Sequence, residues 1–264
     1  MEEIDEIFAI AENGEAAVDT PVALVYCPDR AFLAPYIRRA FGGEKRVIVV
    51  DCLPESMPER AKAAVMISSA EIYAVSEGRN IDESAPLDET SVWYGREEQF
   101  CVLCRDAGVP FAILRCAHVV GTGMTGFPMW LAAGINAGWM VHVKGNEAAV
   151  SVVHAIDVAA IAALVVSGLA EGRAFEPMNV TDGTATSVDD LVDALAFRIN
   201  DKRVWTLGGF MARAAAYFYD KVRYAEMTTT RTFDDARQIA ATEGMKLHVV
   251  TEYLRTHDYT ADDI

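Results

Sequence analysis

Short apolar runs alternate with longer amphipathic stretches along most of this sequence, and this alternation limits the possible folds more than any other feature. The short runs are rich in Val, Ile and Ala, as buried strands are, and the stretches between them have the apolar spacing of helices. Strands are predicted near residues 22–27, 46–51, 65–69, 110–115 and 176–181, and helices near residues 30–41, 57–64, 91–107, 127–137 and 155–169. Because strands and helices alternate, the sequence predicts an α/β fold, with a parallel sheet covered by helices on both faces.

The remaining segments are predicted individually. Residues 3–12 have the apolar spacing of a short amphipathic helix, and short strands are expected near 140–143 and 149–153. Ser187 is followed by acidic residues at the start of another helix, as an N-cap is. The last part of the chain is predicted to be mostly helical, including the segment Arg231–Arg237.

Several segments carry polar residues at the predicted ends of strands and starts of helices. They read Met-Ile-Ser-Ser-Ala-Glu-Ile-Tyr-Ala (66–74), Tyr-Gly-Arg-Glu-Glu (94–98), Phe-Ala-Ile-Leu-Arg-Cys-Ala-His-Val-Val-Gly (111–121), Val-His-Ala-Ile-Asp-Val-Ala (153–159) and Met-Asn-Val-Thr-Asp-Gly (178–183). In order and spacing, residues 66 to about 200 resemble the NAD-dependent epimerase/dehydratase family, the extended short-chain dehydrogenases. That family has Ser-Ser-Ala-x-x-Tyr-Gly at the end of a strand and a Tyr-x-x-x-Lys pair on the next helix.

The resemblance implies a Rossmann-like sheet, here shortened, with a small, mostly helical C-terminal lobe. We expect a single domain over residues 1–264. Its sheet core would comprise about 20–116 and 155–181, and its substrate-type lobe about 117–153 and 182–264. The family also implies NAD or NADP as cofactor and a sugar or nucleotide-sugar ligand. It implies a homodimer as well, through the helix at 91–107 and the next long helix, with Val102, Leu103 and Ala107 in the seam.

By the same resemblance, Ser69 and Tyr94 stand at the catalytic serine and tyrosine, and Glu98 stands at the usual lysine. A phenol with a pKa near 10 is a poor base at neutral pH, and a neighbouring cation helps to ionise it. Tyr94 and Glu98 are four residues apart and would share a helix face, where a carboxylate disfavours the phenolate. We therefore expect Glu98 to suppress general-base chemistry at Tyr94.

The loop after the first strand lacks the glycines with which the family binds the cofactor's pyrophosphate. No glycine occurs between Glu15 and Gly42, and the loop begins Pro28-Asp29-Arg30. Side chains on this loop would crowd a diphosphate, and Asp29 would repel it. Arg30 is the only nearby cation and is our candidate for cofactor contact. Dinucleotide binding is expected to be weak or absent.

Asp51 ends the second predicted strand, 24 residues beyond Cys27, where a ribose-binding acid is found in dinucleotide folds. It is a second candidate for cofactor contact, or an ordinary acid at the end of a strand. Only 13 residues separate Asp51 from Val65, whereas the family has two further strands there. Either strands are missing after residues 46–51, or this segment is itself the fourth strand and earlier units are missing.

Three residues are candidates for contact with a substrate. Arg115 ends a strand beside the family's cleft, His118 replaces an asparagine that faces substrate, and Gly121 opens a glycine-rich loop that could approach a ligand closely. Each also has an ordinary explanation, as an ion pair, a loop histidine or a turn. His154 and Asp157 begin a helix, and we expect them to be structural.

The charge and the cysteines exclude several other classes of function. A net charge of −16 argues against binding to nucleic acid, which needs clustered Lys and Arg, and against anionic membrane surfaces. No apolar run reaches the length of a membrane span, so no membrane partner is expected. An odd number of cysteines predicts reduced thiols and a cytoplasmic protein. No second Cys or His pair lies near Cys101 and Cys104 in the sequence, so no metal site is expected. Cys101 and Cys104 are expected in the core.

Three functions are open at this point. The first is a degenerate family member, a pseudoenzyme that serves as a binding or assembly module. The second is a divergent NAD(P)-dependent epimerase, dehydratase or reductase that uses Ser69 and Tyr94. The third is a glutamate-dependent lyase or isomerase that reuses Tyr94 and Glu98.

Overall fold

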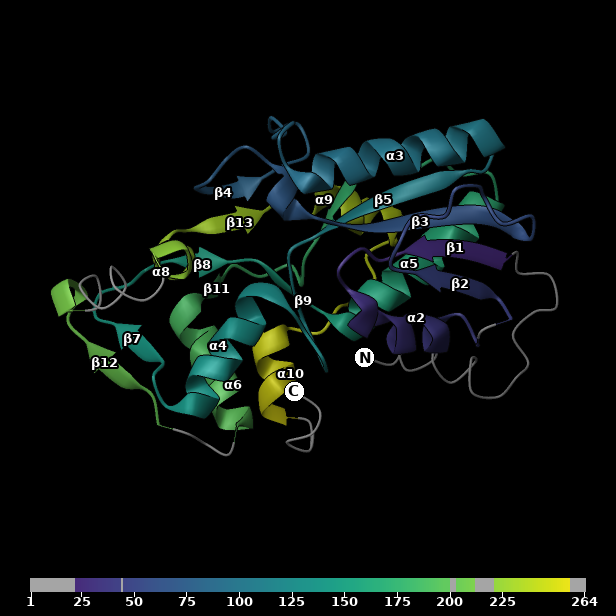
Figure 1. Cartoon of the computed structure of the whole chain (residues 1–264). Helices are drawn as coiled ribbons and strands as arrows, with labels where there is room; N and C mark the ends of the chain where they lie inside the picture. The colour runs from purple at the N-terminus through teal and green to yellow at the C-terminus, as the bar shows by residue number, and fades with distance from the viewer. Residues whose placement is uncertain (1–21, 44, 200–202, 212–220, 257–264) are drawn as a thin grey trace.

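The computed structural model describes residues 22–43, 45–199, 203–211 and 221–256, so the predicted helix at 3–12 lies outside the described residues. Figure 1 shows a layered body built on a central sheet, with a second lobe beneath one end of it. The sheet has five parallel strands. In spatial order they are β10 (Met178–Val180), β5 (Phe111–Cys116), β3 (Ala61–Ser69), β1 (Val22–Tyr26) and β2 (Val47–Val50).

The central strands are apolar on both faces because each face is covered. Ala23 and Val25 of β1 point into a core shared with α2 (Ala34–Ala40) and α5 (Ala155–Ala170). Leu24 and Tyr26 point to the opposite face, toward α3 (Val92–Ala107). Side chains of a strand alternate between the two faces, so a strand buried on both reads as a continuous apolar run. This arrangement confirms the predicted three-layer fold.

The order of the strands decides which part of the family's sheet is missing. β2 lies at the outer edge beyond β1, and β3 lies directly against the other side of β1. In the order 3-2-1-4-5-6 of doubly wound sheets, β2 is therefore the second strand, and the alternative in which it is the fourth is wrong. Residues 51–60 contain neither helix nor strand, and among the described residues no strand occupies the third position of that order, beyond β2.

Two segments that were predicted as helices contain strands in the structure. The segment 57–64 was predicted helical, but β3 already begins at Ala61, whose amide hydrogen-bonds to the Pro58 carbonyl. The segment that begins at Arg231 forms β13 (Arg231–Phe233) and then the short helix α9 (Ala236–Ala241). Both strands are made by pairing with strands remote in the sequence, which local spacing does not reveal.

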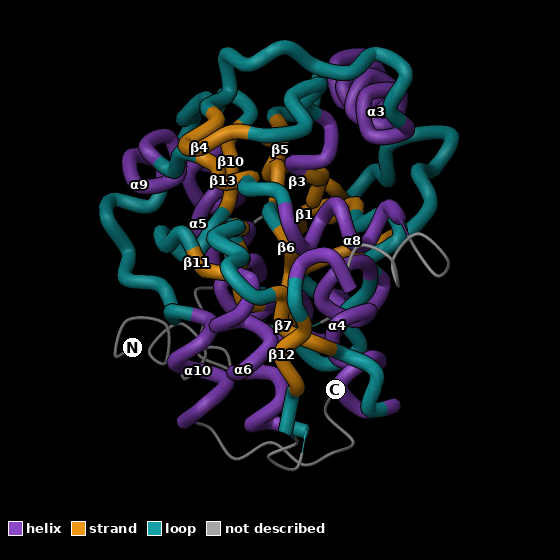
Figure 2. The backbone as a smooth tube through the Cα atoms, turned by 90° about the vertical axis from the view of Figure 1, so that its left-hand side faces the viewer, coloured by secondary structure: helices purple, strands orange, loops and turns teal. Residues whose placement is uncertain are grey.

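The second lobe contains a separate apolar core between α4 (Gly126–Ala137), α6 (Val188–Arg198) and α10 (Val250–Thr256). Ser187 caps α6 through its hydroxyl, as predicted. The remaining strands are short and lie outside the central sheet, and several of them are labelled in Figure 2. They are β4 (Gly78–Ile81), β6 (His118–Val120), β7 (Val141–Val143), β8 (Ala149–Val150), β9 (Val152–His154), β11 (Thr186–Ser187), β12 (Trp205–Leu207) and β13, with η1 (Ala31–Leu33), η2 (Ala70–Ile72) and α8 (Lys221–Thr228) as the remaining helices.

Within the described ranges, no helix is both long enough and apolar enough to cross a membrane.

Candidate functional site

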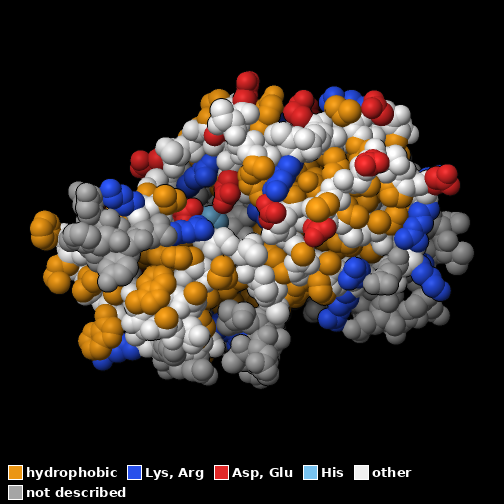
Figure 3. All heavy atoms as spheres, in the orientation of Figure 1, with side chains coloured by type: hydrophobic (Ala, Val, Ile, Leu, Met, Phe, Trp, Pro, Cys, Tyr) orange, Lys and Arg blue, Asp and Glu red, His pale blue; other side chains and the backbone are white. Residues whose placement is uncertain are grey.

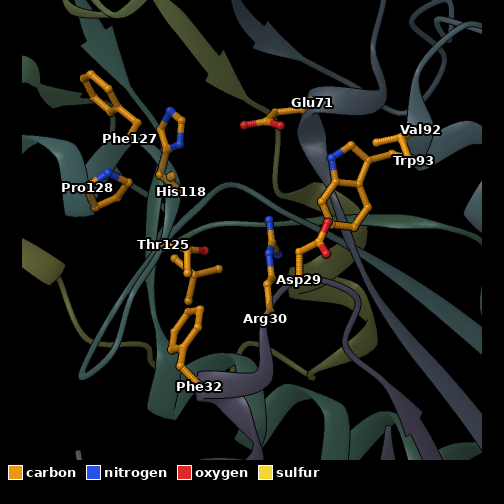
Figure 4. A pocket seen from close by; sticks show the side chains of 12 residues that line it. Asp29, Arg30, Phe32, Glu71, Val92, Trp93, His118, Thr125, Phe127 and Pro128 are labelled. Atoms are coloured by element: carbon orange, nitrogen blue, oxygen red, sulfur yellow. The ribbon is translucent and has the colours of Figure 1, made fainter. Parts of the chain in front are cut away.

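A cavity of about 490 Å³ opens where the ends of β1 and β3 face the second lobe. β1 leads into α2 on one face of the sheet and β3 leads toward α3 on the other, so the chain changes direction between these neighbouring strands. Ligands of α/β sheets bind at such a switch point, beyond the carboxyl ends of the strands. Figure 4 shows the side chains around the cavity, and Figure 3 shows acidic and basic groups close together where the sheet meets the second lobe. The lining residues are Asp29, Arg30, Phe32, Glu71, Val92, Trp93, His118, Val119, Thr125, Gly126, Phe127 and Pro128.

The loop after β1 forms one wall with side chains instead of bare backbone. Asp29 has φ +57°, a left-handed conformation that glycine adopts easily and aspartate tolerates. Its carboxylate accepts a hydrogen bond from Arg96 of α3 at 2.6 Å, although the Asp29 side chain is 70% exposed. The loop is therefore tied to α3 across the mouth of the cavity.

Arg30 fills the space between the ends of the two strands. The residue is only 9% exposed, its Nη1 donates to the Ser68 carbonyl at 2.9 Å, and its guanidinium lies 5.3 Å from the ring centre of Trp93. The family's pyrophosphate site needs glycine backbone in this place. The side chains of Asp29, Arg30 and Phe32 do not fit that way of holding a dinucleotide.

Helix α3 turns a different pair of residues inward than the sequence suggested. Trp93 and Glu97 are buried, in line with Phe100 and Cys104 on the face toward the sheet. Tyr94 is half-buried at the flank of this face and outside the cavity lining, and Glu98, the residue after Glu97, is exposed. The positions four residues apart that face the protein are thus a tryptophan and a glutamate. Sequence reasoning missed both.

Glu97 belongs to a buried polar network. Its carboxylate accepts hydrogen bonds from the Ser68 hydroxyl at 2.6 Å and from Arg115, Nε at 3.1 Å and Nη2 at 2.8 Å. Tyr73 donates to Asn179 at 2.6 Å and accepts from Arg115 at 3.4 Å. Burial lowers the pKa of Arg115, but the bonds to Glu97 outweigh burial and hold that pKa above its usual range. Arg115, a predicted substrate contact, is thus engaged with Glu97 and does not line the cavity.

Ser69 and Asp51, the two candidates predicted at strand ends, both lie outside the cavity lining. Ser69 is buried, and its hydroxyl accepts a hydrogen bond from the amide of Glu71 at 3.2 Å, so it caps η2 and lies outside the lining. Glu71 itself is exposed and its carboxylate points into the cavity (Figure 4). Asp51 is exposed beyond β2 and is also outside the lining.

His118 is the predicted substrate contact that the cavity contains. Its ring lies 5.1 Å from that of Phe127. Burial lowers the pKa of His118, the Glu71 carboxylate raises it, and Arg231 and Arg30 lower it further, with the net result that it falls to about 4. The imidazole is therefore neutral at pH 7.

Gly121 is needed for close packing and does not line the cavity. A Cβ atom on Gly121 would lie 2.7 Å from that of Ala155 and 3.3 Å from the Tyr36 hydroxyl. His154 caps α5, and Asp157 accepts hydrogen bonds from the amide and ring of His248, as expected of structural residues.

The cysteine pair on α3 is part of the core. Cys101 and Cys104 are buried on the inner face of the helix, as predicted.

In the part of the chain that the structure describes, no group of three or more His, Cys, Asp or Glu side chains could hold a metal ion.

Comparison with known proteins identifies the family. The sequence model of the NAD dependent epimerase/dehydratase family matches residues 36–181, more than half of the chain. The chain belongs to this family. The predicted resemblance is thereby confirmed, although none of the curated proteins matches the sequence.

Solved structures of epimerase/dehydratase relatives share the fold at low sequence identity. A putative epimerase from Burkholderia cenocepacia is 14% identical, with a TM-score of 0.61 over 90% of this chain and 97% of its own. A human epimerase family protein with NADPH is 12% identical (TM-score 0.60; 89% and 98% covered). UDP-glucose 4-epimerase from Thermotoga maritima, with UDP-glucose, is 13% identical (TM-score 0.59; 89% and 96% covered). At such identities the likeness establishes the fold alone.

Proposed function

We propose that this chain is a member of the epimerase/dehydratase family that binds a small molecule in the cavity without conventional NAD(P)-dependent catalysis. The observation that carries the proposal is Arg30, which lies between the Ser68 carbonyl and the Trp93 ring where the ends of β1 and β3 meet. A cofactor lying across the switch point would have to displace this side chain. It would also have to bind without the glycine loop.

The inner face of α3 supports the same proposal. General acid–base catalysis needs a group that exchanges a proton near pH 7 within reach of the reacting atom. Trp93 offers an indole N–H that is a donor only. Glu97 is held by Arg115 and Ser68, with both carboxylate oxygens engaged. Neither residue supplies the phenol and ammonium pair that the resemblance implied for this helix.

The test is isothermal titration calorimetry with NAD⁺, NADH, NADP⁺ and NADPH, using the human relative as a positive control, since its structure contains NADPH. No measurable binding to this chain is expected. A micromolar dissociation constant for any of the four would overturn the proposal. It would favour the alternative, a divergent NAD(P)-dependent sugar or nucleotide-sugar epimerase, dehydratase or reductase that uses Ser69 and Tyr94.

We also propose that the chain is a single domain and forms a homodimer through the outer face of α3. Val102, a predicted seam residue, is 50% exposed there, and Ala107 is exposed as well, with Val92 (60% exposed) on the same helix. The third predicted seam residue, Leu103, is half-buried against the core instead. The next long helix, α4, packs against α6 in the second lobe, so each subunit would contribute α3 alone. Light scattering should give twice the monomer mass for the wild type and a monomer for Val102→Asp. A monomeric wild type would contradict the dimer.

A cytoplasmic location is part of the proposal. Cys27, Cys52, Cys101, Cys104 and Cys116 are all free thiols, which suits a reducing compartment.

A further inference from the structure

Arg30 is a buried cation for which no carboxylate partner exists among the described residues. The Ser68 carbonyl and the Cys116 thiol take up two of its N–H groups, whereas a guanidinium has five to donate. The nearest acid in sequence, Asp29, is paired with Arg96 instead. A buried charge without a counter-charge is unfavourable unless something else satisfies it. Arg30 also lines the cavity, and its side chain points up into it (Figure 4).

A second cation adds to the positive field at the same place. Arg231 donates to the carbonyls of Ala70 and Tyr73, at 3.2 and 3.1 Å, and within the described part of the chain its buried Nε has no acceptor. The positive charges of Arg30 and Arg231 both lower the pKa of His118, which lines the cavity. The one unpaired acid of the lining is the exposed Glu71. Asp29 is neutralised by Arg96, and Glu71 offsets part of the field of Arg231, so it is the buried end of the cavity, at Arg30, that favours an anion.

The walls of the cavity are largely aromatic and apolar. Trp93 stands on one side, Phe127 and Pro128 stand on the other, and Phe32 closes the base (Figure 4). A volume of about 490 Å³ suits a small ligand with a flat apolar body. His118, neutral at pH 7, and Thr125 offer hydrogen bonds to an uncharged group but no further charge.

From these features we infer that the cavity is a binding site for a small aromatic carboxylate, whose carboxylate pairs with Arg30 and whose ring lies against Trp93. Arginine pairs well with carboxylates because its planar array of donors matches the two oxygens. This inference rests on the proposed function, since the same space could not also hold a dinucleotide across the switch point.

The experiment compares 3-phenylpropionate with its uncharged counterpart 3-phenylpropionamide by calorimetry and ligand-observed NMR. The acid is expected to bind the wild type at least tenfold more tightly than the amide. Arg30→Met, which keeps most of the alkyl packing, should remove this preference. Arg79→Met makes the same change at an exposed residue of β4 outside the lining and should leave the preference unchanged. Trp93→Leu should weaken both probes to a similar degree.

Several outcomes would overturn the inference. They are equal affinity of acid and amide for the wild type, a comparison that needs no variant to fold, or an unchanged preference in Arg30→Met. Binding of inorganic phosphate in place of 3-phenylpropionate would also overturn it, in favour of a purely anionic ligand. If neither 3-phenylpropionate nor 3-phenylpropionamide binds and the nicotinamide cofactors do not bind either, this inference is wrong but the proposed function stands. Cofactor binding would sink both.

Discussion

The two halves of the central sheet hold helix α3 by different means. On the β3–β5–β10 half, Glu97 is fixed by Arg115 and Ser68 in a buried network that continues to Asn179 of β10. On the β1–β2 half, the polar tie between α3 and the loop after β1 is the exposed pair of Arg96 and Asp29. On the β3–β5–β10 half, α3 is therefore held to the strands by buried hydrogen bonds and an ion pair. On the β1–β2 half the apolar core is also buried, but the polar contact to α3 lies at the surface.

The apolar side chains that cover the α3 face of the sheet become less buried toward the outer strand β2. Phe100 of α3 is fully buried, and its ring packs with those of Tyr26 of β1 and Phe111 of β5, so this residue covers both halves of the sheet. Further out, toward β2, half-buried residues of the loop, Leu53 and Met57, cover the strand in place of a helix. The apolar cover of the sheet therefore weakens only at the β2 edge, while β1 is covered on both faces.

The largest effect is expected at Glu97. Glu97→Ala leaves Arg115 as a buried charge without its partner, and such losses cost about 3–5 kcal/mol. Chemical denaturation measures the free energy of unfolding. Glu98→Ala, which changes the exposed residue next to it, should stay within about 0.5 kcal/mol of the wild type. Equal effects of the two substitutions would mean that the network does not hold α3.

Leucine truncation compares the apolar contribution of the two halves directly. Leu114→Ala in β5, at a fully buried position, should cost about 2–5 kcal/mol. The same change at half-buried Leu53 should cost about 1 kcal/mol, because less apolar surface is lost to solvent there. A cost at Leu53 equal to that at Leu114 would show that the loop is as important as a strand.

The pH dependence of stability tests the environment of His118. Its pKa is lowered to about 4 in the folded protein, so between that value and about 6.5 the unfolded chain binds more protons at this residue. This contribution to stability is therefore complete above about pH 6.5 and is lost as the pH falls toward 4. Other acids titrate in the same range, so the measured quantity is the difference in unfolding free energy between the wild type and His118→Gln. A difference that is independent of pH would contradict the lowered pKa.

The smallest effect is expected for the exposed tie across the cavity mouth. Asp29→Asn should reduce the free energy of unfolding by less than about 1 kcal/mol, because exposed ion pairs contribute little. The reduction should also shrink in high salt. A cost as large as that of Glu97→Ala would remove the contrast between the two halves.

The sequence predicts the family and the parallel sheet because these depend on local patterns. Buried parallel strands read as apolar runs, and the polar ends of β3, β5 and β9 follow in the family's order. The strand at Ala61–Ala64 is not predicted, since alanine favours helix over strand and only the pairing with β1 overrides that preference. For the same reason β13, which pairs with β4 and β8, appears helical from the sequence alone.

The site was predicted less well because it depends on the rotation of one helix. Tyr94 and Glu98 match the family's spacing, but the buried face of α3 is set by Phe100 and Cys104. Counting back from them by helical turns leads to Glu97 and Trp93. That apolar periodicity was the available signal. No sequence signal indicated the stacking of Arg30 on Trp93, because it joins the loop after β1 to the first turn of α3, which is distant in sequence.

The position of β2 at the edge of the sheet also bears on solubility. Along its outer side, no strand pairs with it in the described ranges, and its residues Val47–Val50 are all apolar. An apolar edge strand can recruit another chain and begin aggregation. Here the strand has only four residues, and Arg46 and Asp51 stand at its two ends. Short length and flanking charges commonly protect such an edge from pairing with another chain. Arg46 and Asp51 therefore limit aggregation through the exposed edge of β2.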